Sequence, residues 1–179
     1  GERLMKNKKG CIVALEPKSG EILSMVSAPS YDPNFLVGRK NIRTHYPRLL
    51  NDPDKPLYPR PTQAEYVPGS IFKLIQSLIG LQEKVITKNT SFPCNQSLVG
   101  CHNHAAPNSI AKAIKFSCNP YYYYAVKKII EQKKLDNRYE DAESGLNRWN
   151  DYMQSFGLGK KLNSDIYGLK PGLIPNSSY

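Results

Sequence analysis

The apolar residues near the start of the chain fall in two short runs, CIVAL and EILSMVSA, which are separated by the polar segment EPKSGE. Short apolar runs of this kind are typical of β-strands, and proline, serine and glycine favour the turns that join them. The pattern therefore predicts a β-hairpin over residues 10–28.

A proline-rich stretch follows the hairpin. Residues 29–69 hold eight prolines and show no sustained hydrophobic period. Because proline interrupts both helices and sheet ladders, this composition predicts an extended, loop-rich segment. A loop of this length is uncommon inside a compact domain unless it serves a site, so we expect it to lead to one.

Residues 70–83 hold the clearest helical pattern in the first half of the chain. Apolar side chains surround the cylinder, which is typical of a helix buried on most sides. Ser70 follows Pro68-Gly69 and occupies the helix start, where a hydroxyl is favoured. The unexpected residue is Lys73, because an apolar setting disfavours a cation that lacks a partner.

The second half of the chain is predicted to be mainly helical. Proline or a polar cap opens each helical pattern, and the glycines of FGLGKK end the last one. The predicted helices cover residues 108–116, 120–134 and 141–156. The segment 88–107 is predicted to be a loop, and it carries two cysteines and two histidines.

Ser70 and Lys73 form the pattern S-x-x-K. Residues three apart lie on one face of a helix, so the Lys73 amine is expected to reach the Ser70 hydroxyl. An apolar wall lowers the pKa of a lysine, and a neutral amine is the base that a serine nucleophile needs. The structural alternative is a capping serine and a lysine whose stem lies on apolar surface while its amine reaches water.

A second polar pattern, S-x-N, lies in FSCNPYYYY, between two predicted helices. Ser117 and Asn119 fall at this corner, where they can project into a cleft. Together with S-x-x-K, the pattern is the second element of the signature of penicilloyl-serine transferases. The alternative is that both residues only cap the neighbouring helices.

Four longer segments carry a resemblance to class B penicillin-binding proteins, most of all to the elongation transpeptidases called penicillin-binding protein 2. They run over most of residues 10–175 and read VALEPKSGEILSMVSAPSYDPN, PLYPRPTQAEYVPGSIFK, GCHNH with AIKFSCNPYYY, and FGLGKKLNSDIYGLKPGLIP. Together these segments are far more specific than either short motif. The resemblance favours Ser70 as a nucleophile over Ser70 as a cap.

The resemblance implies an α+β fold, the α/β sandwich of penicillin-binding protein transpeptidases and serine β-lactamases, in which helices flank an antiparallel sheet. The chain, 1–179, is expected to be the N-terminal portion of one such domain, truncated here and cut from a longer protein. Its expected parts are the hairpin 10–28, the loop-rich approach 29–69 and the mainly helical part 70–179.

The chain departs from the family pattern at two places. Pro59-Arg60-Pro61 stands where the family has N-R-A, and the family's third motif, K-[ST]-G, is missing. The letters of Lys18-Ser19-Gly20 match that motif, but they fall in the predicted hairpin turn. Because the motif's strand supplies part of the site, we expect the chain by itself to be inactive or impaired.

The resemblance also implies a reaction and roles for the four motif residues. Ser70 would attack the carbonyl of a D-Ala-D-Ala stem peptide of peptidoglycan, with Lys73 as base. Ser117 would relay a proton, and Asn119 would hold the substrate amide. An amine from a neighbouring strand would then take the acyl group. β-Lactam antibiotics would acylate the same serine, and no cofactor or metal is required.

The implied setting is the periplasmic face of the bacterial inner membrane. The membrane anchor and the contacts with elongation-complex membrane proteins would lie outside this chain. The net charge of +10 suits an anionic neighbourhood. The basic residues are spread out and accompany no nucleic-acid-binding motif, so nucleic acid is not an expected partner. No apolar run is long enough to span a membrane.

The cysteines leave three interpretations open. Cys94, Cys101, His102 and His104 have a spacing that zinc sites use, and Cys118 would supply a further ligand. A Cys94–Cys101 disulfide suits an oxidising periplasm equally well. Free thiols in a loop are the third interpretation.

Two rival functions also remain. A serine β-lactamase or a β-lactam sensor shares S-x-x-K, but differs in how long the acyl-enzyme lasts. A non-catalytic, zinc-stabilised structural module is the alternative of a different class. It would contain metal and would not react with β-lactams.

Overall fold

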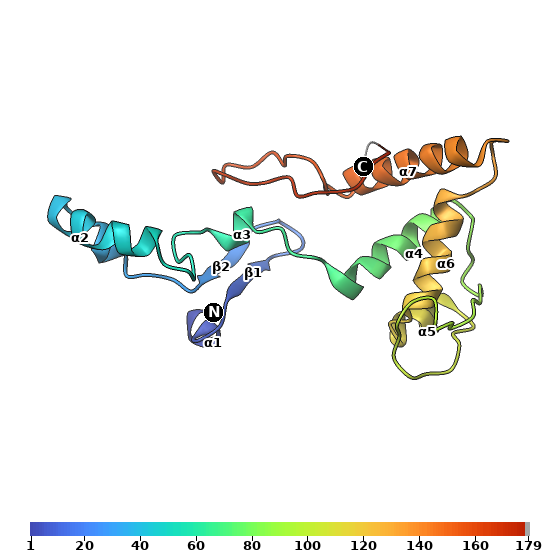
Figure 1. Ribbon diagram of the computed structural model, residues 1–179, viewed down its shortest axis with the longest axis horizontal. Coiled ribbons are helices and arrows are strands. Elements are labelled where there is room, and N and C mark those ends of the chain that lie inside the picture. Colours follow the sequence, from blue (N-terminus) through green and yellow to red (C-terminus); the bar gives the residue numbers. More distant parts are fainter. Residues whose placement is uncertain (178–179) are drawn as a thin grey trace. The chain divides into compact units, whose positions relative to one another are not determined.

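The computed structural model describes residues 1–177, which divide into two compact units (Figure 1). The hairpin unit comprises Gly1–Glu65 and Lys161–Lys170. The helical unit comprises Tyr66–Lys160 and the segment that begins at Pro171. Helices and a two-stranded antiparallel sheet together give the α+β composition that was expected. Whether both units belong to one transpeptidase domain stays a prediction.

The predicted hairpin is confirmed. Strand β1, Gly10–Leu15, pairs antiparallel with strand β2, Ile22–Ala28, and the register shifts between Ala14 and Leu15. The turn closes where the Glu16 N–H donates to the Glu21 carbonyl at 2.8 Å. The sequence Lys18-Ser19-Gly20 lies in this turn, so its match to K-[ST]-G reflects the residues that a turn favours.

The prediction of a loop over 29–69 is wrong for part of this stretch. Three helical segments occur there, at Pro33–Leu36 (η1), Arg39–Leu50 (α2) and Arg60–Gln63 (α3). Helix α2 buries none of its residues, although Ile42, Tyr46 and Leu49 recur at helical spacing along it. Pro47 and the prolines on either side of the helix obscure this short pattern in the sequence. Most of the prolines lie in the connections, and α2 contains only Pro47.

Arg60, the residue that Pro59-Arg60-Pro61 shares with the family's N-R-A, is buried and binds backbone carbonyls. Arg60 is only 3% exposed, and its guanidinium donates to the carbonyls of Asp54 at 2.6 Å and Lys55 at 3.2 Å. The side chain thus satisfies the carbonyls of the loop that leads into α3. A short helix at the chain start, Glu2–Met5 (α1), completes the hairpin unit.

The helical unit contains a short 3₁₀ turn and four helices, which confirm the predicted pattern. They are Gly69–Ile71 (η2), Phe72–Gln82 (α4), Ile110–Lys115 (α5), Asn119–Ile130 (α6) and Arg138–Ser155 (α7). One apolar cluster lies between α5 and α6 and includes Ile110, Ala113 and Tyr121. A second joins α4, α6 and α7 through Ile79, Ile129 and Trp149, and these clusters fix the segments that carry the motifs.

The prediction that α4 is buried on most sides is wrong. Ile71, Leu74 and Leu78 are 77%, 51% and 54% exposed, whereas Gln76 and Ser77 are buried. The helix packs on α5 and α6 with one side, and polar residues there find partners. For example, Trp149 Nε1 donates to Gln76 Oε1 at 3.0 Å. Hydropathy alone therefore misjudged which face meets the core.

Helix α6 ends at Ile130, four residues earlier than predicted. The Asp141 carboxylate accepts the backbone N–H groups of Lys133, Lys134 and Leu135, at 2.8, 2.7 and 3.3 Å. These N–H groups thus bind a side chain rather than continuing the helical pattern. Within residues 1–177, no helix is both long and apolar enough to cross a membrane.

Gly145 lies where α7 meets the end of α6, and a methyl group there would overlap the Ile130 carbonyl. We therefore expect Gly145→Ala to lower the free energy of unfolding by about 2 kcal/mol, although alanine favours helices. Urea unfolding would measure the change. Ser144→Ala, at the exposed neighbouring position, is the control and should be close to neutral. Equal stability of both variants would contradict this packing.

The pKa of Asp141 gives a pH-dependent prediction. Burial raises this pKa, but the three N–H groups and the charge of Arg148 outweigh burial and place it below its usual value. Because the folded-state pKa is lowered, Asp141 stabilises the fold above the ordinary aspartate pKa. This contribution is lost as the pH falls through the folded-state pKa. We expect Asp141→Asn to destabilise the protein at pH 7 and to weaken its acid-side pH dependence, measured by urea unfolding. If Asp141→Asn lost stability with falling pH as steeply as the wild type, this role of Asp141 would be contradicted.

Candidate active site and thiol cluster

Ser70 lies in the 3₁₀ turn directly before α4 and is exposed. Gly69 precedes it with φ of 61°, a conformation that favours glycine. The Ser117 hydroxyl donates to Ser70 Oγ at 2.8 Å. The structure thus brings together the serines of the two motifs, which lie 47 positions apart.

Ser117 occupies the corner between α5 and α6 in a left-handed conformation, with φ of 51°. This conformation is uncommon for residues other than glycine, and strained residues of this kind are enriched at functional sites. The Ser117 N–H donates to the Ile114 carbonyl at 3.0 Å, and the following Cys118 N–H donates to the Ala113 carbonyl at 3.0 Å. These bonds hold the corner so that the Ser117 hydroxyl faces Ser70.

The Lys73 amine lies against this corner. It donates to the Ser117 carbonyl at 2.6 Å, to Ser117 Oγ at 2.9 Å and to Asn119 Oδ1 at 2.5 Å. Burial lowers the pKa of Lys73, and charge interactions with Cys101 and Cys118 act in the opposite direction. The lowered pKa makes the neutral amine more available as a base.

The contact between Lys73 and Ser70 differs from the direct one expected from their spacing. Among the hydrogen bonds described for residues 1–177, Ser117 stands between the two, and its hydroxyl contacts both Lys73 Nζ and Ser70 Oγ. The three groups thus form a continuous path along which a proton can move.

Asn119 is the first residue of α6, and both ends of its side chain are engaged. Its Oδ1 accepts from Lys73, and its Nδ2 donates to the Gly100 carbonyl at 2.7 Å. The contact with Gly100 could not be predicted from the sequence, because every residue has a backbone carbonyl and the residue type does not show which one Asn119 binds.

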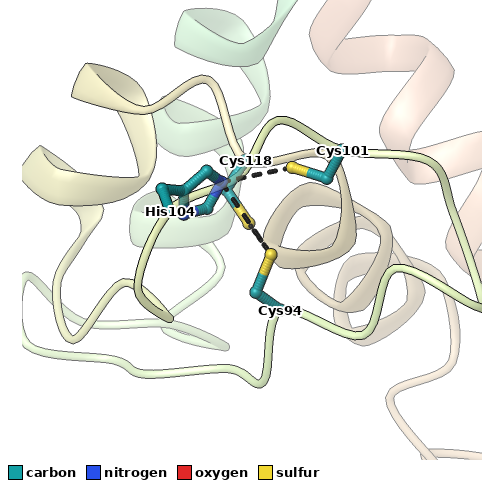
Figure 2. A group of neighbouring side chains, drawn as sticks. All are labelled: Cys94, Cys101, His104 and Cys118. Carbon is teal, nitrogen blue, oxygen red and sulfur yellow. Dashed lines mark hydrogen bonds between the residues drawn. The ribbon is translucent and has the colours of Figure 1, made fainter.

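Next to this site, Cys94, Cys101, His104 and Cys118 form a cluster, which we call the thiol cluster (Figure 2). Their ligand atoms all lie within 4.8 Å of one another. His102, which the spacing suggested, is not in the cluster, whereas Cys118 is. All four cysteines of the chain are free, so the structure contains no Cys94–Cys101 disulfide.

His104 has a defined orientation in the thiol cluster. Its Nδ1 lies 2.8 Å from the Ala105 carbonyl, so that Nε2 faces Cys101 at 3.2 Å and Cys94 at 3.8 Å (Figure 2). Its ring also stacks on Phe116. A histidine that donates through one nitrogen to a carbonyl presents the other as a metal ligand.

The cysteines differ in their electrostatics. Burial raises the pKa of Cys118. Burial also acts to raise the pKa of Cys101, but hydrogen bonds from the Asn119 N–H and from neighbouring members of the thiol cluster lower it to about 7. A donor that favours the thiolate at Cys101 also favours metal binding there, because thiolates are the form that binds metals.

The donor set of the thiol cluster fits zinc. Three thiols and one imidazole make a Cys₃His set, which zinc binds tetrahedrally. Zinc–sulfur bonds of ~2.3 Å place two thiolates about 3.8 Å apart in that geometry. The separation of Cys94 Sγ and Cys118 Sγ is 3.6 Å. The residues present therefore could hold a zinc ion without large rearrangement.

Known proteins resemble this chain over most of its length. The family model "Penicillin binding protein transpeptidase domain" matches residues 10–179. Peptidoglycan D,D-transpeptidase MrdA of Acinetobacter baumannii is 31% identical over 98% of this chain and 25% of that protein. MrdA of Escherichia coli is 28% identical over 99% of this chain and 27% of that protein. The chain thus spans about a quarter of the length of these curated relatives.

Solved structures show the same fold. Pseudomonas aeruginosa PBP2 in complex with WCK 5153 has a TM-score of 0.75 and 30% identity, over 98% of this chain and 38% of that chain. The imipenem acyl-enzyme complex of penicillin-binding protein A from Mycobacterium tuberculosis has a TM-score of 0.72 and 25% identity, over 95% of this chain and 40% of that chain. Helicobacter pylori PBP2 in complex with MreC has a TM-score of 0.73 and 26% identity, over 98% of this chain and 31% of that chain.

These likenesses confirm the expected fold class and the resemblance to penicillin-binding protein 2. The family model covers nearly the whole chain, including the segments that hold Ser70, Lys73, Ser117 and Asn119. The chain belongs to the family of penicillin-binding protein transpeptidase domains.

Proposed function

We propose that the protein is a serine D,D-transpeptidase of the penicillin-binding protein 2 type, which cross-links peptidoglycan stem peptides. The observation that carries the proposal is the hydrogen-bonded path from Ser70 through Ser117 to Lys73. A serine is a weak nucleophile until a base removes its proton, and this path supplies the base. The names of the curated relatives, peptidoglycan D,D-transpeptidases, support the same reaction.

In the acylation step, Ser70 Oγ attacks the carbonyl of the penultimate D-alanine of a stem peptide. The Ser70 proton passes to Ser117, and the Ser117 proton passes to Lys73, which becomes an ammonium. When the peptide bond breaks, the same path returns a proton to the leaving amine of the terminal D-alanine. An acyl-serine and free D-alanine result.

In the second step, an amine from a neighbouring strand attacks the acyl-serine carbonyl and gives its proton to the path. Ser70 leaves with a proton and the cross-link is complete. A β-lactam takes the place of the stem peptide in the first step, and its opened ring remains on Ser70. The imipenem acyl-enzyme of the similar protein from M. tuberculosis supports this part of the proposal.

The role of Asn119 extends beyond the expected substrate contact. Its Oδ1 is close enough to Lys73 to hold the amine beside Ser117. Its Nδ2 binds the Gly100 carbonyl, which orients the amide. We therefore include Asn119 as a residue that positions Lys73, while its contact with the substrate amide stays a prediction.

The proposed setting is the periplasmic face of the inner membrane, with membrane proteins of the elongation machinery as partners. The complex of H. pylori PBP2 with MreC supports this class of partner. The proposed function needs no nucleic acid. Because the one match to K-[ST]-G in these 179 residues lies in the hairpin turn, we further propose that they react poorly when isolated.

The first test is covalent labelling of the complete protein by a reporter penicillin, detected by intact-mass spectrometry. We expect one adduct in the wild type, and none in Ser70→Ala, because Ser70 is the only proposed acceptor. Exposed Ser19, in the hairpin turn, supplies the control variant Ser19→Ala, which should label like the wild type.

Two results would count against a transpeptidase. An adduct that persists in Ser70→Ala would show that another group is the nucleophile. An adduct that hydrolyses within seconds would favour the rival β-lactamase. A long-lived adduct on Ser70, with release of D-alanine from a stem peptide and formation of cross-links, would support the transpeptidase over the β-lactamase and the sensor.

We also propose that the thiol cluster binds one structural zinc ion. The observation that favours it is the convergence of Cys94, Cys101, His104 and Cys118 from a loop and from the corner that carries Ser117. A zinc ion would tie residues 94–104 to the start of α6. It would take no part in the acyl transfer.

Metal analysis tests the zinc proposal. We expect about one zinc per chain in the wild type, purified without chelators, and also in the control Cys11→Ser, because Cys11 lies in β1 and is not a member of the thiol cluster. Cys101→Ser should lose the metal and melt at a lower temperature. Equal, substoichiometric zinc in all three proteins would overturn the proposal.

A further inference from the structure

Besides Ser117 and Asn119, Lys73 has a neighbour that belongs to neither sequence motif. Tyr122 lies on α6, three residues after Asn119, and is only 5% exposed. Its ring centroid is 5.7 Å from Lys73 Nζ. At this distance an aromatic face attracts a cation, and the attraction is stronger where water is excluded.

The Tyr122 hydroxyl is linked to the same lysine by another route. It lies 2.7 Å from Ser77 Oγ, and Ser77 Oγ donates to the Lys73 carbonyl at 2.9 Å. Because Ser77 uses its only hydroxyl proton in that bond, Tyr122 is the donor to Ser77. Burial raises the pKa of Tyr122, which keeps the phenol protonated and able to donate.

Tyr122 is therefore linked to both ends of Lys73, directly at the amine and through Ser77 at the backbone. The ring faces the amine, and the hydroxyl, through Ser77, is linked to the turn of α4 that carries the lysine backbone. Ser77 is 4% exposed, so both groups of the link are shielded from water. A buried side chain with satisfied hydrogen bonds has few alternative positions, which is what a precisely placed base requires.

We propose that Tyr122 is a positioning residue for Lys73 in the acyl transfer. This inference rests on the proposed function, in which Lys73 accepts the proton of Ser70 through Ser117. As the proton arrives, the amine becomes a cation, and the Tyr122 ring stabilises that charge. The ring thus acts in the transition state of acylation more than in the binding of the substrate.

The spacing could have indicated this residue. Asn119 and Tyr122 are three apart on one helix, so both side chains lie on the face that meets α4. The run of four tyrosines, however, offers no means of choosing among them without the packing. Tyr123, the next residue, is 41% exposed, and its only ring contact among those described for residues 1–177 is an edge-to-face contact with Tyr124.

The experiment measures acylation of the complete protein by a reporter penicillin in rapid-mixing kinetics. Its dependence on penicillin concentration separates the apparent dissociation constant from the rate constant for acylation. The variants are Tyr122→Leu, which removes the ring, Tyr122→Phe, which keeps the ring and removes the hydroxyl, and Ser77→Ala, which breaks the link. Tyr123→Leu is the matched control.

We expect Tyr122→Leu to lower the acylation rate constant about tenfold, with the dissociation constant within twofold of wild type. Tyr122→Phe should recover most of the rate, because the ring remains. Ser77→Ala should resemble Tyr122→Phe, and Tyr123→Leu should match the wild type. Tyr122→Met, which fills irregular space well, replaces the leucine variant if that one does not fold.

Two results would overturn the inference alone. One is an unchanged acylation rate constant in folded Tyr122→Leu and Tyr122→Met. The other is an equal loss of rate in Tyr122→Phe and Tyr122→Leu with a common drop in melting temperature, which would show a packing role only. Failure of the wild type to form any adduct on Ser70 would instead overturn the proposed function, and this inference with it.

Discussion

The half-buried amine of Lys73 joins helix α4 to the corner between α5 and α6. An ammonium group taken out of water needs acceptors, and the corner supplies three of them, the Ser117 carbonyl, Ser117 Oγ and Asn119 Oδ1. These contacts fix two segments that lie more than forty positions apart in the chain. They also place the Ser117 hydroxyl between Lys73 and Ser70, so the interaction that satisfies the lysine also builds the path for the proton.

The corner depends in turn on the loop that carries the thiol cluster. Cys118 lies between Ser117 and Asn119, and is fully buried. The Asn119 N–H donates to Cys101, and the Asn119 side chain donates to the Gly100 carbonyl. The loop therefore contacts Asn119 through both its backbone and its side chain. A metal ion that ordered this loop would stabilise the residue that holds Lys73, and structural and catalytic groups would then share one small region.

Local sequence patterns were sufficient for most of the elements. The hairpin follows from two apolar runs and a turn, and the later helices follow from caps, proline and glycine at their ends. Helix α2 was missed because its short apolar pattern lies among prolines and itself contains Pro47. The exposed face of α4 was misjudged for a different reason. Hydropathy reports how apolar a helix is, but which side meets a neighbour depends on packing, as Gln76 and Ser77 show by their buried hydrogen bonds.

For the site, the sequence by itself determined the residue types and their local spacing. Ser70 and Lys73 lie one helical turn apart, and Ser117 and Asn119 flank a helix start. Tertiary structure alone decided that Lys73 meets Ser70 through Ser117, that Cys118 joins the thiol cluster while His102 does not, and that Tyr122 faces the lysine. The physical reason is that hydrogen bonds and ring contacts act over a few ångströms in space. The sequence determines which residues are close in space only when they lie within a turn of the same helix. The contacts named here join segments that are distant in the sequence, and only the folded core brings those segments together.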